Sequence, residues 1–211
     1  MEIKSFAFGP FAENTYVLFD STKECIIIDP GCANKQEEEE LENFITQLAL
    51  RPVRLLNTHT HIDNILGNKF VSDKYKLGLE FCEDDMPTFK LAKVSADMWG
   101  INYNPSPDPA SFIKEGDKIL FGNCELDVIL TPGHSPGSIC FINHATQDAI
   151  VGDVLFNGSI GRTDLPGGNF DTLINSIKSK LLLLPHHYDV YSGHGPKTTI
   201  GYERQHNPFL D

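Results

Sequence analysis

Two histidines and an aspartate alternate with other residues in the stretch THTHIDN, residues 58–64. In an extended segment, residues i and i+2 point the same way, so His59 and His61 can reach one metal ion together. Asp63 follows where the chain is expected to turn into a helix, and a helix start favours a carboxylate. Imidazole suits zinc, iron and copper, and a carboxylate adds neutralising charge. The types and the spacing therefore indicate a metal site.

Apolar runs elsewhere in the chain end in residues of the same kind. The runs DVILTPG, AIVG and DVYSG are followed by His134, Asp153 and His194. The pattern HxHxD alone is also compatible with ordinary strand histidines, but three further strand ends of this type favour a shared site. If the strands lie side by side, their ends gather along one edge of a sheet, where loops present ligands. The predicted metal ligands are His59, His61, Asp63, His134, Asp153 and His194.

Asp29, the serine of the GHSPG motif and four further histidines are not predicted to bind metal. Asp29, which ends the run CIII, is predicted to support the metal loops by hydrogen bonds rather than to bind metal. The motif GHSPG at residues 133–137 matches a serine nucleophile elbow, but Pro136 lacks the N–H that such an elbow uses as an oxyanion donor. This excludes a serine hydrolase. Four further histidines occupy turn-like or terminal contexts and are predicted to lie on the surface: His144, His186, His187 and His206.

The elements that must position these residues are short apolar strands interspersed with helices, which indicates a mixed α and β class. Asn34 is a suitable N-cap for a helix over residues 35–50, and a second helix is expected over 171–182. Their inward faces are predicted to carry Leu41, Phe44, Ile45 and Leu48, and Leu173, Ile174, Ile177 and Leu181. Strands are expected at 26–29, 53–57, 125–131, 138–143, 149–153 and 189–192.

Length, charge and cysteine count limit the possibilities further. The 211 residues suffice for one sizeable core, so a single domain over residues 1–211 is expected. The formal net charge of −12 repels phosphate backbones and anionic lipid heads, so we expect a small-molecule substrate rather than nucleic acid or a membrane. The sequence shows no secretory signal, and its five cysteines are widely spaced. Reduced thiols and a cytoplasmic location are expected.

Four motifs together carry a resemblance to a known family. The stretches THTHIDN, TPGHSPGS, VGDVLFNGSIGRTDLPGG and SGHGPKTTIGYE, in this order, resemble the metallo-β-lactamase-fold hydrolases, and most of all the small glyoxalase II-like (hydroxyacylglutathione hydrolase-like) enzymes. The opening FGPFAENTYVLF and the stretch IIIDPG are also similar to that group, so the likeness covers nearly the whole chain. The resemblance implies an α+β fold: an αββα sandwich of two mixed sheets flanked by helices, with the site at one edge.

The resemblance also implies how the ligands divide between two ions. A first ion is held by the three histidines His59, His61 and His134, Asp153 bridges both ions, and Asp63 and His194 hold the second. The family has another histidine at the position of Asn64. Asparagine coordinates weakly and suits harder cations. We therefore expect a tight first ion and a loose or absent second ion, unless Asn64 still ligates or a water fills the gap. Zinc is the expected metal, as one or two ions, with iron or manganese as alternatives.

The expected activity is that of a metal-dependent hydrolase acting on a small thioester. A bound divalent ion lowers the pKa of its water to roughly 7, so a metal-bound hydroxide can attack the carbonyl carbon. Asp63 is the predicted catalytic residue, because it can orient the water or accept its proton. Sulfur dioxygenases resemble the same fold and use one iron, so a persulfide dioxygenase is one alternative. The other is a homologue that binds metal but has been weakened in catalysis by Asn64.

The substrate is less constrained than the chemistry. Full-length hydroxyacylglutathione hydrolases carry a C-terminal region that grips glutathione, whereas this chain stops at Asp211, which argues against glutathione specificity. β-Lactamase activity is not expected without an export signal. Met98, Trp99 and Tyr103 form either a wall over the site or part of the core. Arg162 either contacts an anionic substrate group or pairs with a carboxylate such as Asp164.

Overall fold

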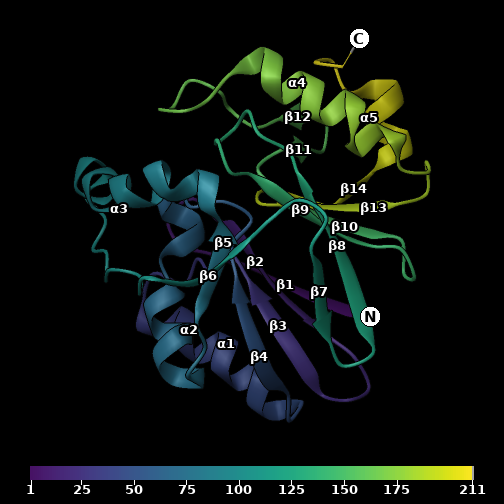
Figure 1. Ribbon diagram of the computed structural model, residues 1–211. Coiled ribbons are helices and arrows are strands. Elements are labelled where there is room, and N and C mark those ends of the chain that lie inside the picture. The colour runs from purple at the N-terminus through teal and green to yellow at the C-terminus, as the bar shows by residue number, and fades with distance from the viewer. Residues whose placement is uncertain (211) are drawn as a thin grey trace.

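The computed structural model describes residues 1–210 and places two mixed β-sheets face to face between helices (Figure 1). The first sheet has the order β1-β2-β3-β4-β5-β6, and the second has the order β14-β13-β10-β9-β8-β7. In the first sheet β1, β2 and β3 pair antiparallel and β3 to β6 pair parallel. In the second sheet only the pair β10–β13 is parallel. This is the predicted α+β sandwich.

The strands are short and the helices few. The strands of the first sheet are β1 (Glu2–Phe8), β2 (Glu13–Phe19), β3 (Glu24–Ile28), β4 (Arg51–Leu56), β5 (Leu79–Cys82) and β6 (Pro109–Ile113). Those of the second are β7 (Lys118–Phe121), β8 (Cys124–Leu130), β9 (Ile139–Asn143), β10 (Asp148–Gly152), β13 (Asp189–Ser192) and β14 (Thr198–Thr199), with a small hairpin of β11 (Leu155–Phe156) and β12 (Ser159–Ile160). The helices are α1 (Lys35–Gln47), α2 (Asn68–Tyr75), α3 (Met86–Trp99), α4 (Phe170–Ser179) and α5 (Ile200–His206), with 3₁₀ turns at Ile62–Ile65, Glu83–Asp85 and Leu181–Leu183.

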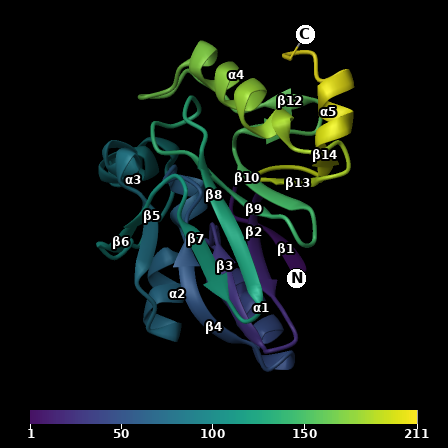
Figure 2. The same cartoon turned by 45° about the vertical axis from the view of Figure 1, so that its right-hand side comes forward.

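Three apolar layers hold the sandwich together. Ile27 of β3 packs with the side chains of α1 and α2, whereas its neighbours Ile26 and Ile28 face the second sheet. Strands buried on both faces read as continuous apolar runs, which explains the sequence CIII. On the far side of the second sheet, Leu173 and Ile177 of α4 pack against β9, β10 and β13. Figure 2 shows α4 and α5 on that outer side, away from the first sheet.

The strands and helices predicted from the sequence are largely confirmed. All six predicted strands exist within about two residues of the expected ends, and Asn34 caps α1 by accepting the N–H of Glu37 on Oδ1 at 3.1 Å. Leu48 is exposed, since α1 ends before it. The second predicted helix ends at Ser179 and continues as a 3₁₀ turn. Helix α3 was not predicted, because its apolar residues face a cavity as well as the core.

The strand ends that carry the predicted ligands belong to two sheets, not to one edge of a single sheet. Strand β4, which precedes His59, His61 and Asp63, lies in the first sheet, whereas β8, β10 and β13 lie in the second. The prediction from the residues alone was therefore wrong on this point. The ends still meet, because the two sheets are packed face to face and the loops leave them on the same side.

The remaining sequence predictions concern single residues. All five cysteines are free, and burial raises the pKa of Cys25, Cys32 and Cys140 to about 12. The side chains of His144, His186, His187 and His206 are exposed, as predicted. No helix within residues 1–210 has both the length and the apolar character needed to cross a bilayer.

Candidate metal centre

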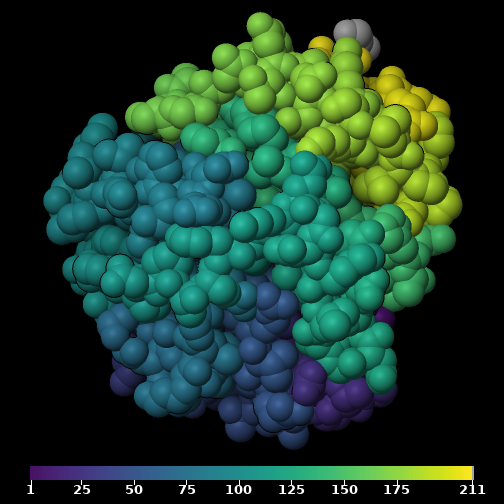
Figure 3. All heavy atoms as spheres, in the orientation of Figure 1, coloured from purple at the N-terminus to yellow at the C-terminus, as the bar shows by residue number. Residues whose placement is uncertain are grey.

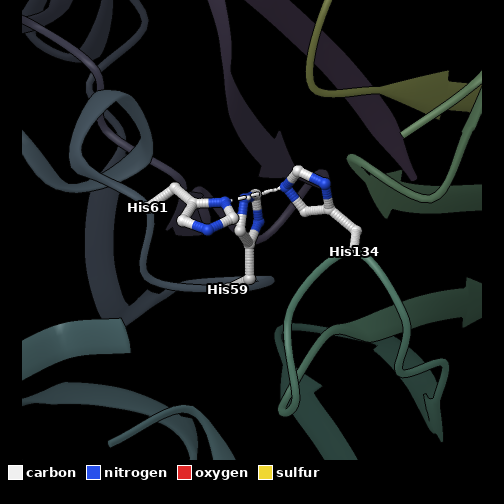
Figure 4. Close-up of side chains that lie close together, drawn as sticks. All are labelled: His59, His61 and His134. Carbon is white, nitrogen blue, oxygen red and sulfur yellow. Dashed lines mark hydrogen bonds between the residues drawn. The ribbon is translucent and has the colours of Figure 1, made fainter. Parts of the chain in front are cut away.

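Three histidine rings converge at the edge between the two sheets (Figure 4). His61 Nδ1 lies 2.8 Å from His134 Nε2, which in turn lies 3.1 Å from His59 Nε2. The ring centroids of each pair are 4.5 to 4.9 Å apart. Ligands at about 2.1 Å from a tetrahedral ion are about 3.4 Å apart, so the three nitrogens have nearly the spacing of a metal site. The predicted first group of ligands is thus brought together from residues far apart in the sequence.

The loop after β4 holds two of these rings by hydrogen bonds on its opposite side. Thr60 points away from His59 and His61, and both its N–H and its hydroxyl donate to Asp85 Oδ2, at 2.5 and 2.6 Å. Asp29 accepts the N–H and the hydroxyl of Thr58, at 2.8 and 2.6 Å, and the same hydroxyl lies 3.2 Å from His59 Nδ1. Asp29 therefore supports the loop, as the sequence predicted, and fixes which nitrogen of His59 faces the site.

His134 is oriented by a loop of the second sheet. Its Nδ1 lies 2.8 Å from the carbonyl oxygen of Arg162, so the ring donates there and presents Nε2 to the centre. The backbone N–H of Gly137 in the same loop donates to Asp85 Oδ1 at 3.1 Å. Asp85 thus ties the loop of His59 and His61 to the loop of His134. Asp85 was not predicted as a site residue, because nothing in the acidic stretch EDD distinguishes it from its exposed neighbours Glu83 and Asp84.

Replacing Asp85 by alanine is expected to lower the free energy of unfolding by about 3–5 kcal/mol, because two buried N–H groups and the hydroxyls of Thr60 and Thr88 lose their carboxylate acceptor. Denaturant unfolding of the metal-free protein, followed by circular dichroism, measures the change. Asp84→Ala is the matched control, since Asp84 is the exposed neighbour and its loss should change stability by less than about 0.5 kcal/mol. Equal stability of the two variants would contradict the role given to Asp85.

A second group of side chains lies next to the three histidines. His194 Nε2 is 3.3 Å from Asp63 Oδ2 and 3.5 Å from Asp153 Oδ2. The same oxygen of Asp153 is 3.5 Å from His134 Nε2 and 4.0 Å from His59 Nε2, so this carboxylate lies between the two groups. Gly193 leaves room for it, since a Cβ there would lie 2.0 Å from Asp153 Oδ1. All six predicted ligands therefore lie in one place.

The pKa values of the histidines show where this centre favours neutral ligands and where it favours a positive charge. Burial and the neighbouring His134 lower the pKa of His59 well below its ordinary value and that of His61 to about 4, so both rings are neutral ligands at pH 7. Burial opposes protonation of His194, but hydrogen bonds with Asp153 and Asp63 outweigh it and raise its pKa to about 10. A positive charge is thus favoured where His194 meets the carboxylates.

Several buried polar atoms of this centre lack a hydrogen-bond partner. Among residues 1–210 such atoms include Glu13 Oε2, Asn64 Oδ1 and Asp153 Oδ1. Native structures leave few buried polar atoms unpaired, and an ion is one common explanation. The imidazole and carboxylate set fits a divalent metal. Glu13 was not predicted as a site residue, because FGPFAENTYVLF contributed only to the family resemblance.

A cavity of about 630 Å³ opens over the centre. Its floor contains His61, Asp63, His134, Asp153 and His194, and much of its wall consists of α3. In the space-filling view α3 lies next to the segment that leads into α4 (Figure 3).

The residues suggested for substrate contact divide between the cavity and the protein interior. Met98 and Trp99 line the cavity with 79% and 58% of their surfaces exposed, whereas Tyr103 is buried and bonds Ser106. Arg162 lines the cavity as well, and its guanidinium pairs with both oxygens of Asp164 at 2.7 and 2.8 Å. The wall prediction thus holds for two of its three residues.

Comparison with known proteins agrees with this geometry. A sequence model described as the Metallo-beta-lactamase superfamily matches residues 8–194. The hydroxyacylglutathione hydrolase GloC of Haemophilus influenzae is 37% identical over 215 residues, which cover 100% of this chain and 99% of the relative. The crystal structure of BLEG-1, a B3 metallo-beta-lactamase, is 35% identical with a TM-score of 0.91 and covers 99% of both chains. That of TTHA1623 in a di-iron-bound form is 35% identical with a TM-score of 0.88, covering 98% of this chain and 100% of the other.

Proposed function

Because this chain belongs to the Metallo-beta-lactamase superfamily, we propose that it is a metal-dependent hydrolase that cleaves a thioester with an apolar acyl group. The observation that carries the proposal is the cavity, whose floor is the imidazole and carboxylate cluster and whose wall is largely apolar. The similarity to GloC, a hydroxyacylglutathione hydrolase, supports a thioester, and GloC has nearly the length of this chain. The length of the chain is therefore no argument against a glutathione thioester.

The centre supplies the parts that hydrolysis needs. His59, His61 and His134 would hold one divalent ion and Asp153 would share it with a second site. A bound divalent ion acidifies water and polarises a carbonyl oxygen. Zinc, iron and manganese all accept this mixture of nitrogen and oxygen ligands. The coordination positions that the side chains leave open would be available to water and substrate.

Asp63 is the residue that we assign to proton transfer. Its side chain is partly exposed at the cavity floor, and its Oδ2 lies 3.3 Å from His194 Nε2. It can orient a water toward the carbonyl carbon and accept the proton that the water loses. The C–S bond then breaks and the sulfur leaves as a thiolate, which is stable enough because thiols have a pKa of about 8.5. The products are a carboxylic acid and a thiol.

The wall of the cavity supports the proposed preference for an apolar acyl group. Leu91, Val94, Met98 and Trp99 of α3 are 41%, 55%, 79% and 58% exposed, and all line the cavity. Phe11 also lines the cavity, and the centroid of its ring lies 5.4 Å from that of Trp99 in an edge-to-face contact. Exposed apolar side chains gathered in a concave surface mark a binding site for an apolar group.

The proposal is tested by measuring thiol release from a series of acyl thioesters of increasing chain length. We expect kcat/KM to rise by about 4-fold per added methylene over the first few carbons, as each buried CH₂ contributes about 0.8 kcal/mol. A chromogenic cephalosporin belongs in the same panel, because the likeness to BLEG-1 makes a β-lactam the second candidate substrate. Cleavage of the cephalosporin without thiol release from any thioester would refute the proposal.

Replacing Trp99 by alanine is expected to lower kcat/KM for an octanoyl thioester about 10-fold and for an acetyl thioester less than about 2-fold, because only the longer chain reaches the wall. Steady-state kinetics with the two substrates measure the ratio. Leu120→Ala is the control: Leu120 is also a large exposed apolar residue, but it lies on β7 and does not line the cavity. An equal loss for both substrates in Trp99→Ala would show that the wall does not select the acyl chain.

A further inference from the structure

Glu13 is an acidic side chain with no exposed surface at the first position of β2. Its Oε1 accepts a hydrogen bond from Asn64 Nδ2 at 2.8 Å. Its Oε2 lies 3.0 Å from His194 Nε2, but no hydrogen bond to Oε2 forms among residues 1–210. A buried carboxylate is costly unless it is paired or binds a cation. Its environment calls for a positive charge next to Oε2.

The distances show where that charge belongs. Glu13 Oε2 is 3.0 Å from His194 Nε2, the atom that also lies 3.3 Å from Asp63 Oδ2 and 3.5 Å from Asp153 Oδ2. Two ligands of a tetrahedral ion are about 3.4 Å apart. The nearest ligand atoms of Glu13, Asp63 and His194 all lie within 4.8 Å of one another, which is close enough for one ion.

The backbone holds Glu13 in this place. Glu13 and His194 form an antiparallel bridge, although 181 positions separate them. The neighbouring Asn14 reinforces it: its backbone N–H donates to Gly193 O at 2.6 Å, and its side chain donates to the carbonyls of Ser192 and Gly195, at 2.9 Å each. His194 is also fixed from its other nitrogen, since Nδ1 lies 3.1 Å from Phe11 O. The two side chains are therefore set against each other before any ion binds.

Asn64 has a supporting position in this arrangement. A carboxylate only accepts hydrogen bonds, so the amide nitrogen of Asn64, not its oxygen, must face Glu13. That bond occupies Oε1 and leaves Oε2 directed at His194. The sequence alone led us to expect a loose second ion because Asn64 stands where the family has a histidine. That expectation assumed that no other residue takes the place of the missing imidazole.

We propose that Glu13 is the missing ligand, and that Glu13, Asp63, His194 and the shared Asp153 form a second metal site. Three carboxylates and one imidazole make this site richer in oxygen than the three-histidine site. It should therefore favour a harder ion such as Mn²⁺, whereas the first site suits zinc. The inference rests on the metal centre of the proposed function but not on its substrate.

The test is a titration of the metal-free, full-length protein with Mn²⁺, measured by equilibrium dialysis and elemental analysis. We expect the wild type to bind two ions per chain. Glu13→Gln should keep one ion and bind the second at least about 100-fold more weakly, since it loses a charged ligand at nearly constant size. Mn²⁺ electron paramagnetic resonance gives an independent readout, because only a pair of neighbouring ions shows exchange coupling.

A rescue variant separates a lost ligand from a damaged fold. In the double variant Glu13→Gln/Asn64→His an imidazole returns to the centre, so the second ion should bind again, now with a relative preference for Zn²⁺ over Mn²⁺. Glu203→Gln is the matched control: Glu203 is also fully buried, but it bonds Thr198 and Asn207 away from the centre, so this variant should still bind two ions.

Two outcomes would overturn the proposal: a wild type that binds one ion, or a Glu13→Gln variant that binds both ions with unchanged affinity. Failure of the proposed function is distinguishable from these. Two ions that depend on Glu13, in a protein that releases no thiol from any thioester, would leave the second site standing and refute only the substrate. Thiol release that is unaffected by Glu13→Gln, with two ions still bound, would refute the second site and leave the thioester substrate standing.

Discussion

Dialysis of the protein against a chelating agent is expected to abolish thioester hydrolysis, and addition of Zn²⁺ or Mn²⁺ is expected to restore it. Without an ion, the rings of His59, His61 and His134 cannot lower the pKa of water, which then stays far above the value of about 7 that a bound divalent ion gives. Hydroxide at the centre then becomes scarcer by many orders of magnitude, so thiol release should fall below detection. A thiol-release assay, run beside elemental analysis of the same samples, measures both quantities.

Two variants test whether the metal dependence of hydrolysis comes from the three-histidine site. His134→Ala should remain inactive after metal is added back, because it removes the nitrogen that lies closest to both other rings. His144→Ala should behave like the wild type, since His144 is exposed, its Nδ1 bonds the Tyr188 hydroxyl and its Nε2 lies 3.2 Å from Asp127 Oδ2, away from the centre. Circular dichroism should show folded protein throughout. Full turnover by a preparation shown to be free of metal would refute the mechanism.

Replacing Asp63 by asparagine is expected to lower kcat for thioester hydrolysis by about 10²–10⁴-fold, the range typical of a lost general base. Asparagine has nearly the size of aspartate, so the cavity should keep its shape and KM should change little. It cannot accept a proton from the water at the cavity floor. Steady-state kinetics measure the loss, and elemental analysis shows whether the ions of both sites are retained, since Asp63 is also a proposed ligand of the second site.

The matched control for this substitution is Asp97→Asn on α3. Asp97 is exposed and pairs with Lys93 at 2.6 Å, a surface ion pair of little energetic weight. It should change kcat by less than about 2-fold. If Asp63→Asn retained wild-type turnover with its ions in place, Asp63 could not be the proton acceptor, and another group at the cavity floor would have to be sought.

The motifs of the amino-acid sequence predicted the family and the fold class by resemblance, and its residue types and their spacing predicted six of the residues that gather at the centre. The reason is local: His59, His61 and Asp63 are separated by single residues, and His134, Asp153 and His194 each follow an apolar run. The type of a residue and its place at the end of a strand carry this information without any knowledge of packing. The N-cap of α1 and the exposed histidines were predictable for the same reason.

The tertiary structure decided what depends on contacts between distant segments. Asp85 joins two loops that carry histidines, and α3 places Met98 and Trp99 over the centre. The same holds for Glu13, whose neighbour His194 is 181 positions away. An acidic residue at the start of a strand looks like any exposed acid in the sequence. Only the packing of one sheet against the other buries it beside an imidazole and two carboxylates, and burial is what turns an ordinary glutamate into a candidate ligand.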